Sequence, residues 1–201
     1  MIIRTKHFML LAACGVVAGT AGAHGPARLK VEHSIDIQAP ADKVWARIAN
    51  FHDMSWHPAI ASTQGSGGNV PDATRLLTLK GGDGKATIEE ALNKYSAEHM
   101  SYMYKITKVD VAVLPVTNYA ATITVTSTGP SSSKVEWRGG FYRGYPNNDP
   151  PANLNDDAAI KAVTGIYQSG LDGLKAEMEK GGRSASRRDG GSVAAAISAP
   201  E

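Results

Sequence analysis

Arg75 and Glu90 are the residues of this sequence whose charges and spacing point most directly to a binding site. They lie in two predicted strands on either side of residues 81–84, a glycine-rich run typical of a β-hairpin turn. If Lys80 pairs with Lys85 across this turn, Arg75 stands opposite Glu90, and strand alternation turns both side chains to the inward, apolar face. We therefore predict an Arg75–Glu90 ion pair inside a cavity or at its lip. Because guanidinium groups bind carboxylates and phosphates in a forked geometry, the pair could anchor a ligand; a purely structural pair is the other interpretation.

His57 is the histidine best placed for acid–base chemistry. It follows Trp56 in a short segment where a pocket could open, and an imidazole can gain or lose a proton near neutral pH. No serine or cysteine is visibly partnered with it, and Asp53 is only a local candidate for orienting the ring. Two interpretations stay open. His57 could be the base of an enzyme in which Arg75 stabilises an enolate, or a polar histidine at the cavity rim, packed on Trp56.

Aromatic residues fall on the predicted inward faces and would contact an apolar ligand. An ordinary hydrophobic core contains the same residue types, so cavity lining and core packing are both open. The candidate ligand-binding residues are Trp56, His57, Arg75, Glu90, Tyr104, Tyr119, Trp137 and Phe141. We also expect Trp45 on an inward face, His33 in the core of the first strand, and His99 in a loop.

The sequence contains no motif for a metal or a cofactor. Its acidic residues at 147–149 and 155–157 lack the spacing of an EF-hand, and Asn155 or Asp156 is explained by a helix cap. The glycine-rich nucleotide motifs, the zinc-protease motif and the nucleophile elbow are absent from the sequence. We therefore predict no metal and no cofactor, and we assign no catalytic residue.

The first 23 residues have the three regions of a secretory signal peptide. Arg4 and Lys6 make a positive start, an apolar run follows, and residues 21–23 form a small-residue cleavage site. We expect cleavage after Ala23 and a periplasmic or secreted protein; lipidation at Cys14 is the alternative. Since Cys14 is the only cysteine, a chain cleaved after Ala23 has no disulfide and no thiol nucleophile.

The charge balance argues against a nucleic-acid partner. The whole chain contains 21 Lys and Arg against 19 Asp and Glu. Two of the basic residues belong to the predicted signal peptide, which has no acidic residue, so 19 basic residues face 19 acidic ones after cleavage. A formally neutral chain has no overall attraction for a polyanion. We also expect no transmembrane segment in the mature protein.

Hydrophobic periodicity predicts one domain over residues 24–180, followed by a disordered tail over residues 181–201. Alternation predicts strands at residues 29–38, 61–67, 73–80, 85–95, 101–109, 115–128 and 134–142. Helical spacing predicts two short helices after the first strand, the second over residues 51–58, and a long helix from about Asn155 to Lys180. This order predicts an α+β fold in which a curved antiparallel sheet of six to seven strands wraps around the C-terminal helix.

Several short segments, taken in their order and spacing, resemble the START-like, Bet v 1-type helix-grip superfamily, in its polyketide cyclase/dehydrase and lipid-transport (SRPBCC) branch. The segments are Ala39-Pro40-Ala41-Asp42-Lys43-Val44-Trp45, Trp56-His57-Pro58, Arg75, Ile88-Glu89-Glu90-Ala91-Leu92, Tyr104-Lys105-Ile106, Leu114-Pro115-Val116 and Val135-Glu136-Trp137-Arg138. Within that superfamily, the secreted form with Phe141-Tyr142-Arg143-Gly144-Tyr145-Pro146 before the long helix is similar to the MxaD-type family of periplasmic methanol-oxidation accessory proteins.

The resemblance implies a helix-grip fold and an accessory role that aids methanol dehydrogenase and its cytochrome c acceptor, without chemistry of its own. Two other functions stay open. One is an enzyme of the cyclase or dehydratase type, and the other is a periplasmic carrier of an apolar or carboxylate-bearing small molecule. An interior filled by the aromatic residues and the long helix would weaken both pocket functions and favour the interaction role.

Overall fold

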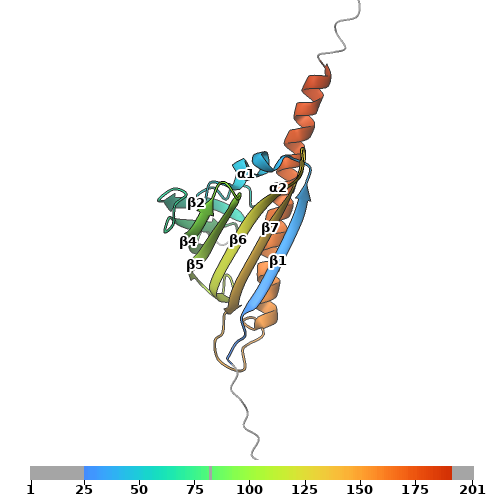
Figure 1. Cartoon of the computed structure of the whole chain (residues 1–201). Helices are drawn as coiled ribbons and strands as arrows, with labels where there is room; N and C mark the ends of the chain where they lie inside the picture. Colours follow the sequence, from blue (N-terminus) through green and yellow to red (C-terminus); the bar gives the residue numbers. More distant parts are fainter. Residues whose placement is uncertain (1–24, 82, 192–201) are drawn as a thin grey trace, which may run out of the picture.

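The computed structural model describes residues 25–81 and 83–191, which form a sheet folded around one long helix (Figure 1). The elements in chain order are β1 (Leu29–Ile37), α1 (Ala41–Ile48), β2 (Ile60–Ser66), β3 (Thr74–Leu79), β4 (Thr87–Ser96), β5 (Ser101–Val109), β6 (Val116–Gly129), β7 (Ser132–Arg143) and α2 (Asp156–Gly191). The strands form a seven-stranded antiparallel sheet in the order β1-β7-β6-β5-β4-β3-β2. The predicted α+β helix-grip fold is confirmed.

Alternation along the strands builds the inner face of the sheet. In β6 and β7, Ile123 pairs with Trp137 and Val125 with Val135, and all four side chains are buried. Residues between them carry polar side chains to the outer face, as a half-buried antiparallel sheet requires. The inner face therefore carries the aromatic residues that the sequence predicts there.

The C-terminal helix α2 lies along the concave side of the sheet, next to β1 and β7, and its C-terminal part projects beyond the strands (Figure 1). It begins after Asn155, whose Oδ1 accepts a hydrogen bond from the Ala158 N–H at 2.8 Å, so the predicted helix cap is confirmed. Its buried stripe is Ala159, Val163, Tyr167, Leu171 and Leu174. The helix continues past Lys180 to Gly191, so its end was predicted too early. The rest of the predicted tail, residues 192–201, lies outside the described residues, as does the predicted signal peptide up to Ala23.

The second predicted short helix is wrong, because residues 51–58 form a series of turns. A helix would place Trp56 on the face opposite Met54, yet both side chains are buried. Local polar contacts favour the turns. The Phe51 N–H donates to Asn69 Oδ1 at 2.9 Å, and Asp53 Oδ1 accepts the Ser55 N–H at 2.9 Å.

Two smaller expectations concern histidines. His33 is only half-buried on β1, so its placement in the core is wrong. Its strand lies at the edge of the sheet. His99 lies in the turn between β4 and β5, as predicted. Among the described residues, no helix is both long and apolar enough to cross a membrane.

Candidate functional site

A cavity of about 90 Å³ lies between the sheet, the turn segment 51–58 and α2. It is lined by Met54, His57, Ala59, Ile60, Leu77, Leu79, Ile88, Glu90, Tyr104, Ile106, Leu114, Tyr119, Trp137 and Ile166. An engineered cavity of about 150 Å³ accepts benzene, and drug-sized ligands occupy about 300–1,000 Å³. In this conformation the cavity therefore has room for a molecule of only a few non-hydrogen atoms.

The predicted Arg75–Glu90 ion pair is present, in the predicted register. Arg75 pairs with Glu90 across β3 and β4, and its Nε donates to Glu90 Oε2 at 2.6 Å. Both side chains are buried, at 0% and 5% exposure. Burial raises the pKa of Glu90, although the charge of Arg75 acts in the opposite direction. The pair is therefore inside the protein, as the parity of the hairpin requires.

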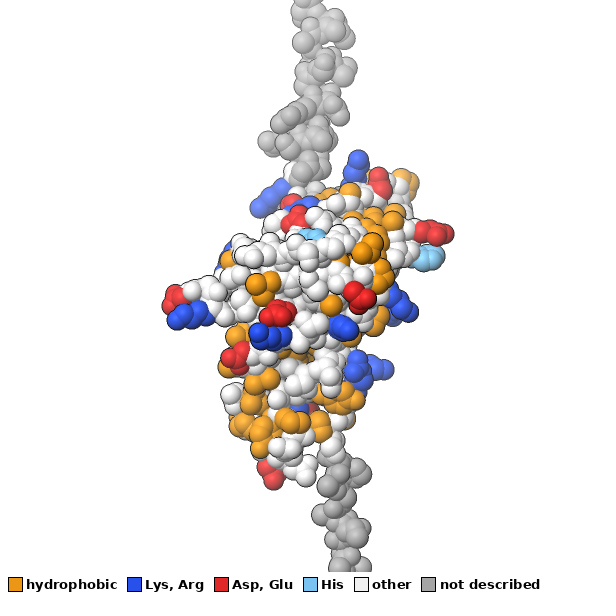
Figure 2. Space-filling view, turned by 90° about the vertical axis from the view of Figure 1, so that its left-hand side faces the viewer, with side chains coloured by type: hydrophobic (Ala, Val, Ile, Leu, Met, Phe, Trp, Pro, Cys, Tyr) orange, Lys and Arg blue, Asp and Glu red, His pale blue; other side chains and the backbone are white. Residues whose placement is uncertain are grey.

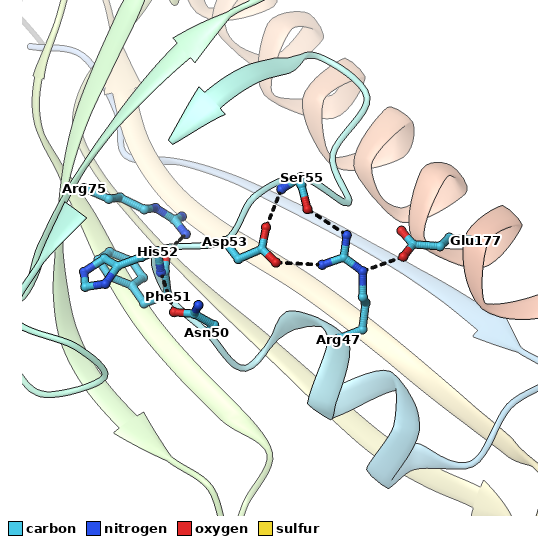
Figure 3. Close-up of polar contacts among 8 residues, drawn as sticks. All are labelled: Arg47, Asn50, Phe51, His52, Asp53, Ser55, Arg75 and Glu177. Atoms are coloured by element: carbon cyan, nitrogen blue, oxygen red, sulfur yellow. Dashed lines mark hydrogen bonds and ion pairs between the residues drawn. The ribbon is translucent and has the colours of Figure 1, made fainter. Parts of the chain in front are cut away.

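The guanidinium of Arg75 is closed off from the cavity. Its Nη1 donates to the carbonyl oxygen of Phe51 at 2.7 Å, a contact drawn in Figure 3. Its plane lies over the Phe51 ring at 4.1 Å and near the Tyr104 ring at 5.0 Å. The remaining nitrogen, Nη2, is fully enclosed and has no hydrogen-bond partner among the described residues. Glu90, and not Arg75, is the member of the pair that lines the cavity.

His57 is fixed by the backbone on both sides of its ring. Nδ1 accepts the Ala59 N–H at 3.1 Å, and Nε2 lies 3.1 Å from the carbonyl oxygen of Ile166 on α2. These partners require the tautomer in which Nε2 carries the proton and donates it. The ring is 2% exposed, and burial lowers the pKa of His57. His57 is thus a neutral histidine that joins the turn segment to α2, and neither of its nitrogens is free to act as a base.

A chain of hydroxyl groups crosses the interior next to Glu90. The Trp137 indole N–H donates to Tyr104 Oη at 3.1 Å, Tyr104 Oη lies 3.4 Å from Tyr119 Oη, and Tyr119 Oη lies 2.6 Å from Tyr167 Oη. Burial raises the pKa of all three tyrosines, so they stay protonated. The negative charge of Glu90 also raises the pKa of Tyr104 and Tyr167, which places both hydroxyls within its field.

Tyr167 was missed as a site residue. The sequence shows it only as a member of the apolar stripe of the long helix. Its ring stacks on Trp137 with centroids 4.5 Å apart, and its hydroxyl occupies the space beside Gly139, where a Cβ would lie 2.2 Å from it. A hydroxyl-bearing side chain in an otherwise apolar stripe is the signal that could have identified it.

The remaining candidates surround the cavity without lining it. Trp56 packs against both His57 and Trp137, with ring centroids 5.8 Å from each. Phe141 stacks on Tyr119 with centroids 5.9 Å apart. Five of the eight predicted residues line the cavity, namely His57, Glu90, Tyr104, Tyr119 and Trp137. Trp56, Arg75 and Phe141 form the layer behind them.

A second polar cluster, also missed, holds the turn segment in place (Figure 3). Arg47 at the end of α1 donates to Asp53 Oδ2 at 3.1 Å, to Ser55 Oγ at 2.9 Å and to Glu177 Oε1 on α2 at 2.5 Å. Burial by itself would raise the pKa of Asp53. Hydrogen bonds from Ser55 and Arg47, together with the charge of Arg47, outweigh this effect and lower the pKa of Asp53. Asp53 therefore orients Arg47 and the turn, and not His57. The turn segment is connected to α2 twice, by Arg47 and by His57.

No group of three or more His, Cys, Asp or Glu side chains within residues 25–81 and 83–180 is placed to hold a metal ion. The polar side chains that line the cavity are those of Glu90, His57, Tyr104, Tyr119 and Trp137.

A sheet that grips a helix around a small apolar cavity defines the chain as a helix-grip protein. The sequence profile of the family described as "Polyketide cyclase / dehydrase and lipid transport" matches residues 28–179. The chain belongs to this family.

Similar solved structures have the same helix-grip fold. Protein XoxI from Bacillus cereus is 31% identical with a TM-score of 0.62, the match covering 74% of this chain and 94% of that one. An uncharacterised protein from Bacillus thuringiensis is 32% identical with a TM-score of 0.63, covering 75% and 98%. Norcoclaurine synthase from Thalictrum flavum, 15% identical with a TM-score of 0.57 and coverage of 87% and 98%, shares the fold. No curated protein matches the chain.

Proposed function

We propose that the protein is a non-enzymatic periplasmic accessory factor that binds a small molecule in its cavity and aids the transfer of electrons from methanol dehydrogenase to cytochrome c. The non-enzymatic part of the proposal rests on the hydrogen bonds and the protonation of His57. Both of its ring nitrogens are bonded to backbone groups, and burial keeps the ring neutral. An enzyme of the cyclase type would have to use Glu90 instead, since Arg75 does not reach the cavity to stabilise an enolate.

The size of the cavity bears on the carrier alternative. The family description includes lipid transport, but about 90 Å³ is far below the volume that a lipid-sized ligand fills. A carrier of such a molecule would have to move α2 or the turn segment, which Arg47 and His57 hold together. The small volume of the cavity therefore favours a role in which the ligand is small and the outer surface makes the functional contact.

The methanol-oxidation part of the proposal comes from the sequence. It rests on the similarity of residues 141–146 and the predicted signal peptide to the MxaD-type accessory proteins. The face shown in Figure 2 carries basic and acidic side chains interspersed, together with hydrophobic side chains that gather toward its lower part. A surface of this kind favours partner contact through shape and apolar area over attraction by a single charge sign.

The test measures reduction of cytochrome c by methanol dehydrogenase from the source organism, with and without the full mature protein. We expect the protein to raise the rate in a saturable way, at concentrations at which serum albumin has no effect. No change in rate, with no binding to either redox protein by interferometry, would overturn the accessory role. Native mass spectrometry of protein purified from the periplasm tests the carrier alternative, which requires a bound lipid-like molecule.

A further inference from the structure

The polar chain that reaches the cavity has one more hydrogen-bond donor than it has hydrogen bonds. Trp137, Tyr104, Tyr119 and Tyr167 together supply four N–H or O–H protons, and three hydrogen bonds connect them. Four donors in three bonds leave one O–H without an acceptor among the described residues. When Tyr167 donates to Tyr119 and Tyr119 donates to Tyr104, the open O–H is that of Tyr104, which lines the cavity. Burying such a donor unpaired is costly, so this proton is available to a ligand.

Glu90 supplies the matching acceptor. Its Oε2 receives the Arg75 Nε–H, while its Oε1 receives no hydrogen bond from the described residues. The residue is 4% exposed and lines the cavity. Tyr104 and Tyr119 line the same cavity, and the hydroxyl of Tyr104 lies within the field of Glu90. An open acceptor and an open donor thus face one small space whose other walls are apolar.

The charge of this site decides the class of ligand. Glu90 is already balanced by Arg75, so a ligand ammonium would bring an uncompensated positive charge into a buried, largely apolar site. A ligand carboxylate would face Glu90 directly, because the guanidinium of Arg75 is enclosed behind it. A neutral hydroxyl group offers one donor and one acceptor, which matches what the cavity leaves open.

We propose that the cavity recognises a small neutral alcohol, whose hydroxyl donates to Glu90 Oε1 and accepts the free proton of the tyrosine chain. This inference rests on the proposed small-molecule-binding function and specifies its ligand. The carbon chain of the alcohol would pack against apolar lining residues such as Leu77, Ile88 and Ile106. The preference is the reverse of the carboxylate preference that the sequence predicts from Arg75.

The test compares probes with the same number of non-hydrogen atoms on the wild-type protein: 1-butanol, diethyl ether, butylammonium and propionate. Binding is followed by NMR shifts of the methyl groups that line the cavity. We expect 1-butanol to bind with a Kd about tenfold lower than that of the ether, because the ether cannot donate to Glu90. The two charged probes should bind more weakly still. Equal binding of alcohol and ether, or tightest binding of either ion, would overturn the proposal.

Two further measurements separate the possible failures. Xenon reports on the cavity itself, without any polar recognition. If xenon shifts the lining methyls but the alcohol has no advantage, the ligand class is wrong and small-molecule binding stands; if neither probe binds, the binding function fails as well. Glu90→Gln presents an amide N–H₂ to the cavity and should remove the advantage of the alcohol over the ether. Glu89→Gln, its neighbour on the outer face, is the matched control and should keep the advantage. If Glu90→Gln does not fold, the wild-type series decides alone.

Discussion

Replacing Gly170 of α2 by alanine should destabilise the protein, although alanine is the better helix former. A Cβ at this position would lie 2.6 Å from His57 Cδ2 and 2.9 Å from Trp137 Cζ3. Both rings are buried, and His57 is held by hydrogen bonds at each nitrogen. The clash therefore falls on rigid groups that have no room to move. Overpacking of this kind costs about 1–3 kcal/mol, and loss of the His57–Ile166 bond adds about 1 kcal/mol. The higher helix propensity of alanine offsets about 1 kcal/mol of this loss. We expect a net loss of about 1–3 kcal/mol.

Gly165 provides the matched control on the same helix. It is exposed, and a Cβ there would have no atom within 4 Å. Gly165→Ala should therefore gain about 0.5–1 kcal/mol from helix propensity alone. Urea unfolding of both variants and the wild type measures the free energies, and NMR of the His57 ring reports whether its bonds survive. If Gly170→Ala is as stable as Gly165→Ala, the close approach of His57 and Trp137 to α2 is not real.

Three further perturbations test the polar contacts. Arg75→Met leaves the Glu90 carboxylate buried without its partner and should lower the free energy of unfolding in urea by about 3–5 kcal/mol. The double variant Arg75→Met, Glu90→Leu should recover most of this loss. A double variant as unstable as the single one would contradict this expectation. Arg47→Ala should lower the free energy of unfolding by only about 1 kcal/mol, because its partner Glu177 is 46% exposed. This loss of stability should become smaller in high salt. An unchanged loss in salt would mean that packing, and not charge, holds the turn. The pKa of His57 is lower in the folded protein than in the unfolded chain, so the unfolded chain binds more protons at acidic pH, and stability should fall as the pH drops below about 6.5. Urea midpoints from pH 7.5 to 5 should therefore decline more steeply for the wild type than for His57→Gln, and parallel curves would refute the assignment.

The register of the β3–β4 hairpin could be predicted because local rules determine it. A glycine-rich turn of four residues and strict alternation leave one pairing that keeps the apolar side chains inward. The same rules placed Tyr104, Tyr119 and Trp137 on the inner face. The overall architecture followed from the order of strands and the amphipathic stripe of the last helix, both of which are properties of short windows of sequence.

The role of His57 could not be predicted, because its partners are backbone atoms. One is the N–H of Ala59 and the other is the carbonyl of Ile166, more than a hundred residues away along the chain. Every residue has such groups, so no pattern of side chains signals the contact. The turns of residues 51–58 were missed for a related reason. Asn69 caps the Phe51 N–H from a distant loop, and this tertiary contact overrides the local helical spacing.

The ligand that we propose differs from the one that the residue types alone suggest. The sequence predicts that Arg75 and Glu90 meet, and from the residue types alone the arginine is the obvious anchor for an anion. Which member of the pair faces the cavity depends on a third group, the carbonyl of Phe51, which draws the guanidinium toward the turn segment at 2.7 Å. With two of its nitrogens bonded and its plane against the Phe51 ring, Arg75 holds Glu90 beside the cavity, and its charge opposes the effect of burial on the pKa of Glu90. In the proposed site the accessible group is therefore an acceptor, which would select a ligand that donates a hydrogen bond. Any prediction of a ligand from a buried ion pair therefore needs the partners of both ions, because a single backbone carbonyl can reverse the charge that the ligand meets.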